Sequence, residues 1–203
     1  MNAESLSPVL CLASASPRRR ELLRQIGVPH LGVPADIDET IRVGETAQEY
    51  VLRMAREKAG CIWNDTQARN ALPVLAADTV VVVDGRVVGK PRDAADARSM
   101  LAALSDRAHT VLSAVALHCG RGANLRLSIS TVRLRALTSA EIDAYIGSAE
   151  PNDKAGGYAI QGLGAVFVES MSGSYSGVMG LPLFETAQLL TNAGIRVWGA
   201  VSQ

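Results

Sequence analysis

VLAADTVVVVDGRVV, residues 74–88, carries a strong strand signal. Its apolar segments Val74–Ala77 and Val80–Asp84, the second of which contains four consecutive valines, predict strand structure. Asp84-Gly85 predicts a tight turn that returns the chain into Val87-Val88. A strand hairpin is therefore predicted over residues 74–88.

Outward from this hairpin, valine-rich segments alternate with segments of 3.6-residue periodicity, which indicates an α/β fold. Further strands are predicted at Val9–Ala13 and in a long hairpin of His109–His118 and Leu125–Leu137 around Gly120-Arg121-Gly122. Helices are predicted at Pro17–Ile26, Thr46–Trp63, Ala94–Leu104, Thr138–Ile146 and Pro182–Asn192. We expect the glycine-rich segment 156–180 to lie between elements, and one domain to cover residues 1–203.

Composition excludes several classes of protein. Of the 203 residues, 48% are hydrophobic and 20% are charged, which is ordinary globular usage and not that of a disordered chain. The formal net charge of +0 argues against a nucleic-acid partner. Three scattered cysteines, the lack of a signal-peptide pattern and short apolar runs favour a cytoplasmic protein without a membrane partner.

The first candidate site is SASPRR, residues 14–19, directly after the first predicted strand. Ser16 is a suitable helix cap and Pro17 suits the first helical turn, so free backbone amides there can bind an anion. Arg18 and Arg19 add donors that match phosphate oxygens, and Arg19 shares the helix face of apolar residues. The alternative is a solvated basic helix start.

The second candidate is Lys58, which lies near the middle of the apolar stripe of the 46–63 helix. A charge at such a position is costly unless it is paired or serves a site. The alternative is a lysine whose ammonium reaches water along its own stem. From the helical phase alone, Lys58→Met is predicted to remove activity and to keep stability.

Carboxylates form the third candidate. Asp78 interrupts two apolar strand segments, and strand ends in α/β sheets are common ligand sites. Beside phosphate-binding cations, Asp78 suggests a Mg²⁺ ligand or a general base, and Glu39 offers a second oxygen ligand. The alternative for Asp78 is a turn or cap carboxylate, and Asp36 and Asp38 fit a solvated acidic loop.

Two loops supply the remaining candidates. Gly89 and Pro91 bracket Lys90, although this tripeptide is also an ordinary turn. In NDKAGGYAIQG, residues 152–162, glycines allow close backbone approach, and Gln161 can both donate to and accept from a base edge. The phosphate-binding P-loop pattern is absent from the sequence.

Six short motifs occur in one order: SASPRR, EKA, ADT, GKP, DKAGGY and GLPL. In this respect the chain resembles the Maf family of nucleotide pyrophosphatases, from about Val9 to about Asn192. The resemblance implies an α/β fold of the inosine-triphosphatase type, with a long curved mixed sheet and two lobes that flank a cleft. It also implies hydrolysis of a nucleoside triphosphate to the monophosphate and pyrophosphate with Mg²⁺ or Mn²⁺, and it suggests a homodimer.

The resemblance carries roles to particular positions. Asp78, Lys58 and Glu39 become the catalytic residues, with Asp78 as the proton acceptor and Asp78 and Glu39 as metal ligands. The substrate-binding residues become Ser14, Ser16, Arg18, Arg19, Thr79, Lys90 and Gln161.

Within the resembled family, one branch acts on dTTP and UTP and another prefers 7-methyl-GTP. The second branch carries Trp, Gln and Glu where this chain has Arg18, Thr79 and Gln161. The resemblance therefore implies dTTP and UTP as substrates, removal of non-standard pyrimidine nucleotides and a link to cell-division arrest. The alternatives are the 7-methyl-GTP branch and a regulator of septum formation that binds nucleotides without turnover.

Overall fold

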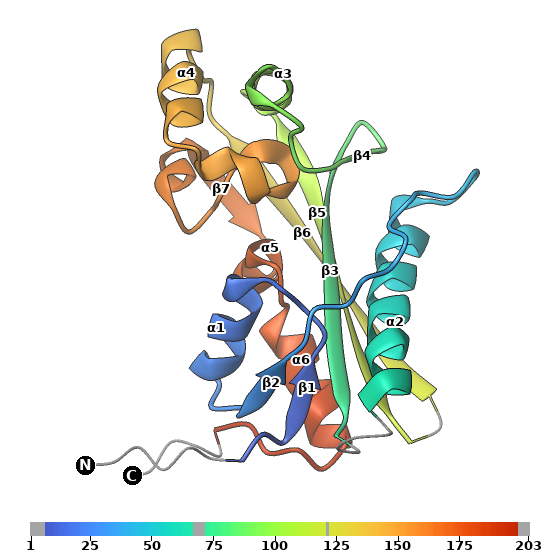
Figure 1. The fold of residues 1–203 in the computed structure, drawn as a ribbon. Coiled ribbons are helices and arrows are strands. Elements are labelled where there is room, and N and C mark those ends of the chain that lie inside the picture. The colour runs from blue at the N-terminus through green and yellow to red at the C-terminus, as the bar shows by residue number, and fades with distance from the viewer. Residues whose placement is uncertain (1–6, 67–71, 121, 199–203) are drawn as a thin grey trace.

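The computed structural model describes residues 7–66, 72–120 and 122–198. Within these ranges the chain forms a seven-stranded sheet with helices on both faces (Figure 1). The strands are β1 (Leu10–Leu12), β2 (His30–Gly32), β3 (Val74–Val83), β4 (Arg86–Val88), β5 (Ala108–Cys119), β6 (Gly122–Leu134) and β7 (Val168–Ser172). The α-helices are α1 (Pro17–Gln25), α2 (Ala47–Thr66), α3 (Ala94–Leu104), α4 (Ser139–Gly147), α5 (Tyr175–Met179) and α6 (Leu183–Asn192). Three 3₁₀ helices are η1 (Glu150–Asp153), η2 (Ala155–Gly157) and η3 (Leu163–Phe167).

The sheet is mixed and has the strand order β2-β1-β3-β5-β6-β7, with β4 paired to β3. β1 runs parallel to both β2 and β3, whereas the β3–β5, β5–β6, β6–β7 and β3–β4 pairs are antiparallel. Strands β3, β5 and β6 are long and run through the whole molecule (Figure 1). The expected α/β class and long mixed sheet are confirmed.

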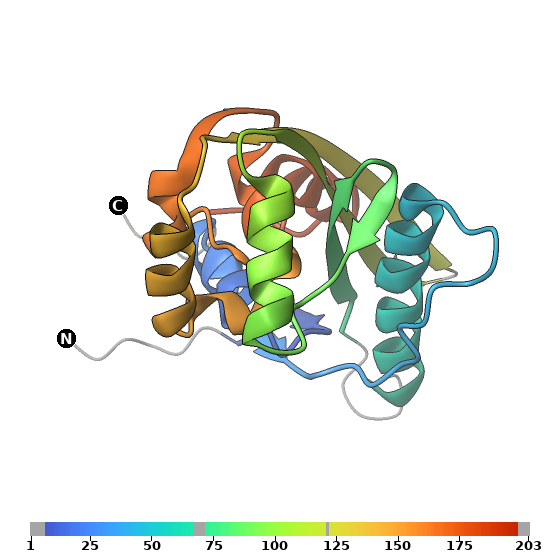
Figure 2. The ribbon, with the colours of Figure 1, turned by 90° about the horizontal axis from the view of Figure 1, so that it is seen from above.

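Alternation of side chains along β3 divides the core between the two faces of the sheet. Val74, Ala76 and Val80 point toward α2, which covers one face. On the opposite face, Leu75 and Ala77 pack in a cluster with residues of α1 and α6, and Val81 packs in another with residues of α3 and α4. Figure 2 shows α2 and the α3–α4 pair on opposite sides of the strands. We call the part around α1 and α6 the lower lobe and the part around α3 and α4 the upper lobe; the long strands β3, β5 and β6 join them (Figure 1).

Most predicted elements lie within three residues of their observed bounds, and the capping box of Thr138 and Glu141 starts α4. Two expectations are wrong. Segment 156–180 is expected to lie between elements, but it contains η3, β7 and α5. The sequence does not predict them because short elements in a glycine-rich segment leave no periodic signal. Asp78 lies inside the continuous ten-residue strand β3 and not at a junction, because its backbone pairs with Ala114 of β5. Arg121 of the predicted hairpin lies outside the described residues.

Among the residues that the structure describes, no helix is long and apolar enough to cross a membrane.

A buried polar pair in the upper lobe makes folding sensitive to acid. The Nε2 atom of His109 lies 2.7 Å from the Tyr158 hydroxyl, and burial lowers the pKa of His109 to about 4. An unfolded chain protonates this histidine near its ordinary pKa of about 6.5, so it binds more protons than the folded chain between about pH 6.5 and 4. The free energy of unfolding therefore decreases as pH falls through this window.

We expect this histidine to remove about 2 kcal/mol of stability between pH 7 and pH 5. Urea unfolding at both pH values measures the loss in the wild type and in His109→Gln, whose amide does not titrate. Other titrating groups are common to both proteins, so their difference isolates His109. An equal pH dependence of the two proteins would contradict this expectation.

Candidate functional site

A cleft lies where one edge of β3 lacks a strand partner. On this edge, β1 pairs with β3 at Val74 and Leu75, and β4 pairs with it at Val81–Val83. Between these two ladders, residues 76–80 have no partner among the described strands on the side opposite β5. The sheet is therefore open along one side of the strand that carries Asp78 and Thr79.

The gap lets the cleft reach both faces of the sheet. Asp78 and Thr79 are neighbours in a strand and point to opposite faces, yet both line one cleft of about 540 Å³. Loops that follow β1 and β4 close its ends, since Ser14 comes after the first strand and Lys90 after the other. This placement explains how a mid-strand carboxylate reaches a ligand site.

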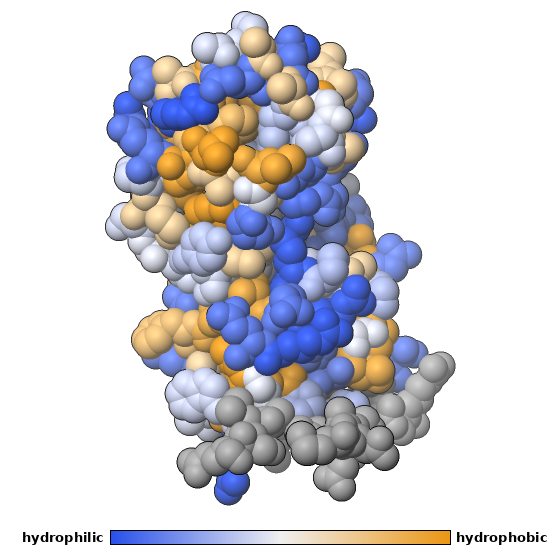
Figure 3. All heavy atoms as spheres, turned by 90° about the vertical axis from the view of Figure 1, so that its left-hand side faces the viewer, coloured by the Kyte–Doolittle hydropathy of each residue, from blue (hydrophilic) through white to orange (hydrophobic). Residues whose placement is uncertain are grey.

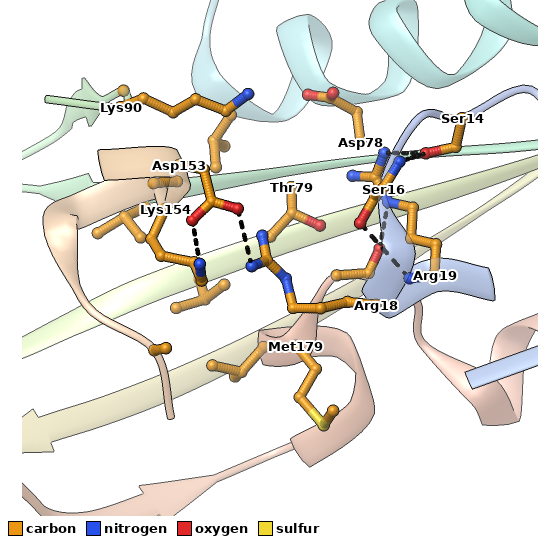
Figure 4. A pocket seen from close by; sticks show the side chains of 18 of the residues that line it. Ser14, Ser16, Arg18, Arg19, Asp78, Thr79, Lys90, Asp153, Lys154 and Met179 are labelled. Carbon is orange, nitrogen blue, oxygen red and sulfur yellow. Dashed lines mark hydrogen bonds and ion pairs between the residues drawn. The ribbon is translucent and has the colours of Figure 1, made fainter. Parts of the chain in front are cut away.

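All ten residues that the sequence singled out line this cleft: Ser14, Ser16, Arg18, Arg19, Glu39, Lys58, Asp78, Thr79, Lys90 and Gln161. Tyr50, Met179 and Gly180 also line the cleft and were not selected from the sequence, whereas Asp153 and Lys154 belong to the NDKAGGYAIQG segment without having been given a role. Figure 4 shows how side chains from the β1–α1 junction, β3 and the 153–154 turn lie around one space.

On the α2 face, Lys58 lies between two carboxylates. Its Nζ atom is 2.8 Å from Asp78 Oδ1 and 2.7 Å from Glu39 Oε1. Lys58 is 8% exposed and Asp78 is 7% exposed, whereas the Glu39 side chain is 56% exposed. The lysine is therefore paired and buried, and its ammonium does not extend to open water as the alternative required.

The loop that carries Glu39 is fastened to α2. The Tyr50 hydroxyl donates to the Glu39 carbonyl oxygen at 3.0 Å. Burial, together with the nearby Asp78 and Glu39 charges, raises the pKa of Tyr50 to about 12, so the phenol stays a donor. Arg53 donates to the Thr40 carbonyl at 3.0 Å and to Glu45 Oε2 at 2.7 Å. These contacts hold Glu39 near Lys58.

On the opposite face, the start of α1 presents cationic groups. Ser16 caps the helix by accepting from the Arg19 amide at 3.4 Å, and its own amide donates to Ser14 Oγ at 3.1 Å. The Arg19 side chain donates from Nε to the Gly180 carbonyl at 2.8 Å. Burial lowers the pKa of Arg19 and the nearby Asp78 charge opposes this, so the guanidinium stays charged. Figure 3 shows the side of the molecule that lies on the left in Figure 1, where a hydrophilic patch below the middle is bordered by hydrophobic residues.

One ion pair crosses the cleft between the lobes. Arg18 Nη1 lies 3.4 Å from Asp153 Oδ2, and Lys154 pairs with the other oxygen of the same carboxylate (Figure 4). The Asp153 side chain is 62% exposed. Exposed pairs of this kind contribute little, about 0–1 kcal/mol, so an incoming anion can displace Asp153 at small cost.

The upper wall of the cleft is built from two loops that bond to each other. The Gly156 amide donates to the Gly89 carbonyl at 3.0 Å. Gly156 has a φ of 72°, and a Cβ there would lie 3.1 Å from a Val81 methyl group, so glycine is required. The loop neighbours Lys90 and Gln161 are exposed, and both line the cleft.

Glu150 shapes the Gln161 loop, and sequence reasoning missed it. Its two carboxylate oxygens accept from the Leu163 and Gly164 amides at 3.0 Å each, and one of them also accepts from the Tyr145 hydroxyl at 2.7 Å. These bonds satisfy backbone donors that would otherwise lack partners in the turn after Gln161. The only signal in the sequence was its position just before the NDKAGGY segment.

The residues present fit a divalent cation only together with a ligand. Glu39 and Asp78 converge on one point, the Lys58 ammonium. Within the described ranges no group of three His, Cys, Asp or Glu side chains comes together as a metal site. One or two carboxylates plus substrate phosphates are the usual ligands of protein-bound Mg²⁺. The donor set therefore matches a metal that arrives with a phosphorylated substrate.

The model of a family described as "Maf-like protein" matches residues 9–193 of this chain. A protein of Bordetella avium named dTTP/UTP pyrophosphatase is 56% identical over 194 residues, covering 93% of this chain and 96% of that protein. A Nitrosomonas europaea protein of the same name is 51% identical over 197 residues, covering 92% and 95%. Among solved structures, a nucleoside-triphosphatase / dITP/XTP pyrophosphatase of Mycobacterium abscessus is 17% identical, covers 90% of this chain and 94% of its own, and gives a TM-score of 0.42.

The Lys58–Asp78 contact changes the stability expected of Lys58→Met. Removing one partner of a buried ion pair leaves the other charge uncompensated, which generally destabilises by about 3–5 kcal/mol. Since Arg19 remains near Asp78, we expect Lys58→Met to lose about 2 kcal/mol and Lys58→Met/Asp78→Asn to regain most of it. Urea unfolding of both single variants and the double variant measures this. Purely additive changes would show that the pair is not energetically coupled.

Proposed function

Because this chain belongs to the Maf-like protein family, we propose that it is a pyrophosphatase that hydrolyses dTTP and UTP to the monophosphate and pyrophosphate. The relatives named dTTP/UTP pyrophosphatase, at 51–58% identity over nearly their whole length, support this activity. The observation that carries the proposal is a single cleft with the cationic start of α1 on one face and the Glu39–Lys58–Asp78 cluster on the other.

In the proposed reaction, water attacks the α-phosphorus and the bond from this phosphorus to the bridging α–β oxygen breaks. The bridging oxygen leaves with pyrophosphate, and the water loses a proton. Phosphoryl transfer of this kind depends on positioning and on stabilising charge at the phosphate oxygens. The proposed residues for these tasks come from both faces of the cleft.

Binding of the triphosphate is assigned to the lower lobe and the cleft mouth. Ser14 and Ser16 line the cleft at the start of α1, and each hydroxyl oxygen already accepts from a backbone amide, so their hydroxyl protons are the proposed donors to the phosphates. Arg19, held by the Gly180 carbonyl, keeps its charged end in the cleft. Lys90 lies exposed at the opposite end and is the proposed partner of the leaving phosphates.

Proton transfer is assigned to Asp78. Lys58 donates to its Oδ1 atom at 2.8 Å, which orients the carboxylate and leaves Oδ2 to accept the proton of the attacking water. Lys58 also approaches Glu39, so its charge offsets both carboxylates before substrate binds. A divalent cation held by Asp78 and Glu39 would neutralise charge on the phosphate oxygens.

Base recognition is assigned to Arg18, Thr79 and Gln161. A uracil or thymine ring offers two carbonyl acceptors on either side of an N–H donor. Arg18 donates only, whereas Gln161 can donate and accept. Both residues line the same cleft as Thr79, which leaves space beside the base because it is small.

We place the reaction in the cytoplasm and retain the homodimer that the family resemblance suggests. Cys11, Cys61 and Cys119 are free thiols, which suits the reducing cytoplasm where we place the reaction. The homodimer stays a prediction, and sedimentation velocity measures it.

Asp78→Asn is expected to keep the fold and to lose at least about 100-fold in the rate of pyrophosphate release. The substitution is nearly isosteric but removes the proton acceptor. Pyrophosphate release from dTTP and UTP with Mg²⁺ or Mn²⁺, together with circular dichroism, measures both properties. Activity like that of the wild type in a folded variant would contradict the role of Asp78, and no release by the wild type would favour a binding protein.

Gln161→Glu is expected to lower kcat/KM for UTP and dTTP relative to 7-methyl-GTP. A carboxylate cannot donate to a pyrimidine carbonyl but attracts the cationic methylated guanine. The measurement is kcat/KM for dTTP, UTP, CTP, GTP and 7-methyl-GTP with both proteins. A wild type that prefers 7-methyl-GTP would contradict the pyrimidine assignment, and an unchanged ranking in the variant would remove Gln161 from the base site.

A further inference from the structure

A buried serine contacts Thr79 in the middle of the sheet. Ser113 of β5 lies directly opposite Thr79 of β3 in the strand register and is 1% exposed. The two hydroxyl oxygens are 2.9 Å apart, and Ser113 Oγ is also 2.6 Å from the carbonyl oxygen of Gly177 in α5. The serine therefore links the cleft residue Thr79 to the helix behind it.

The directions of these two hydrogen bonds follow from counting protons. A carbonyl oxygen can only accept, so the 2.6 Å contact requires Ser113 to donate its single hydroxyl proton to Gly177. The 2.9 Å contact also needs a proton, and Ser113 has none left to give. Thr79 must therefore donate to Ser113, and its hydroxyl oxygen offers only lone pairs to the cleft.

Thr79 is placed where a ligand can meet this acceptor. It is half-buried and lines the cleft. Figure 4 shows its side chain between Asp78 and the guanidinium of Arg18, the base-binding arginine proposed above. A ligand group that approaches Thr79 Oγ1 must bring a donor, since two facing acceptors without a proton lose a hydrogen bond and are desolvated.

We propose that Ser113 is a specificity-determining residue that acts through Thr79, by holding its hydroxyl as an acceptor for the ring N–H of uracil or thymine. This inference rests on the proposed function. Arg18 and Gln161 would donate to the flanking carbonyls, so the site presents donor, acceptor and donor. Cytosine has a lone pair in place of the ring N–H, so its ring nitrogen mismatches the acceptor at Thr79.

Ser113→Ala tests the inference. Without Ser113 Oγ the Thr79 hydroxyl is free to turn and donate to the ring nitrogen of cytosine. We expect the ratio of kcat/KM for CTP to that for UTP to rise about tenfold, within the usual cost of an unmatched buried polar group. Ser113→Thr keeps a hydroxyl on the same carbon and is expected to keep the wild-type ratio. In a Thr79→Val background, Ser113→Ala is expected to leave the ratio unchanged, because the effect passes through Thr79.

Ser113→Ala also removes a hydrogen bond to Gly177 of α5, and Ser130→Ala is the matched control for this second effect. Ser130 is a buried serine of β6 whose Oγ accepts from the Ser174 amide at 3.0 Å, next to the first residue of α5. It does not line the cleft. Its loss is therefore expected to lower stability somewhat and to leave the CTP/UTP ratio unchanged.

The outcomes separate this inference from the proposed function. A raised ratio in Ser113→Ala, absent in Ser130→Ala and absent in the Thr79→Val background, supports the inference. A wild type that favours UTP while Ser113→Ala keeps its ratio overturns the inference alone, and an equal rise in Ser130→Ala does the same by assigning the effect to α5. A wild type without preference for UTP over CTP overturns both.

Discussion

The missing strand partner along one edge of β3 is the constraint on which the site depends. A fully paired sheet separates its two faces, so Asp78 and Thr79 would serve different surfaces of the molecule. Because β1 pairs with β3 only as far as Leu75 and β4 only from Val81 onward, residues 76–80 leave an opening that connects the two faces of the sheet. The unpaired backbone edge also places main-chain groups at a ligand site, where hydrogen-bonding groups of a substrate can satisfy them.

Because of this opening, charged side chains from both faces of the sheet reach one cleft, and each face contributes a different set. The buried Lys58 and the two carboxylates come from the side of α2, while Arg18 and Arg19 come from the side of α1. A charge is kept in place by a partner on its own side, as Lys58 is by Asp78 and Arg19 is by the Gly180 carbonyl. The cluster is therefore preorganised before a polyanion arrives, which reduces the reorganisation needed during reaction.

Sequence reasoning located the residues that depend on local rules. Helical phase placed Lys58 on the inner stripe of α2, and capping chemistry placed Ser16 at the start of α1. It failed where long-range pairing decides: β5 extends β3 through Asp78, and Glu150 organises a turn more than ten residues away. The sequence did not indicate a role for Ser113 for the same reason. Only the register between β3 and β5 shows that this serine lies beside Thr79.

Several cationic side chains line the cleft close to one another, and carboxylates offset their charges. Arg18 and Lys154 both pair with the exposed carboxylate of Asp153, so this carboxylate neutralises part of the positive charge between the two lobes. The pair is weak because solvent screens it, so substrate binding can release Arg18 from Asp153 for its proposed contact with the base. The deeper Lys58–Asp78 pair is buried and cannot exchange so easily. The cleft thus combines an exposed ion pair at its mouth, which costs little to separate, with a buried ion pair at its base, which costs more to separate.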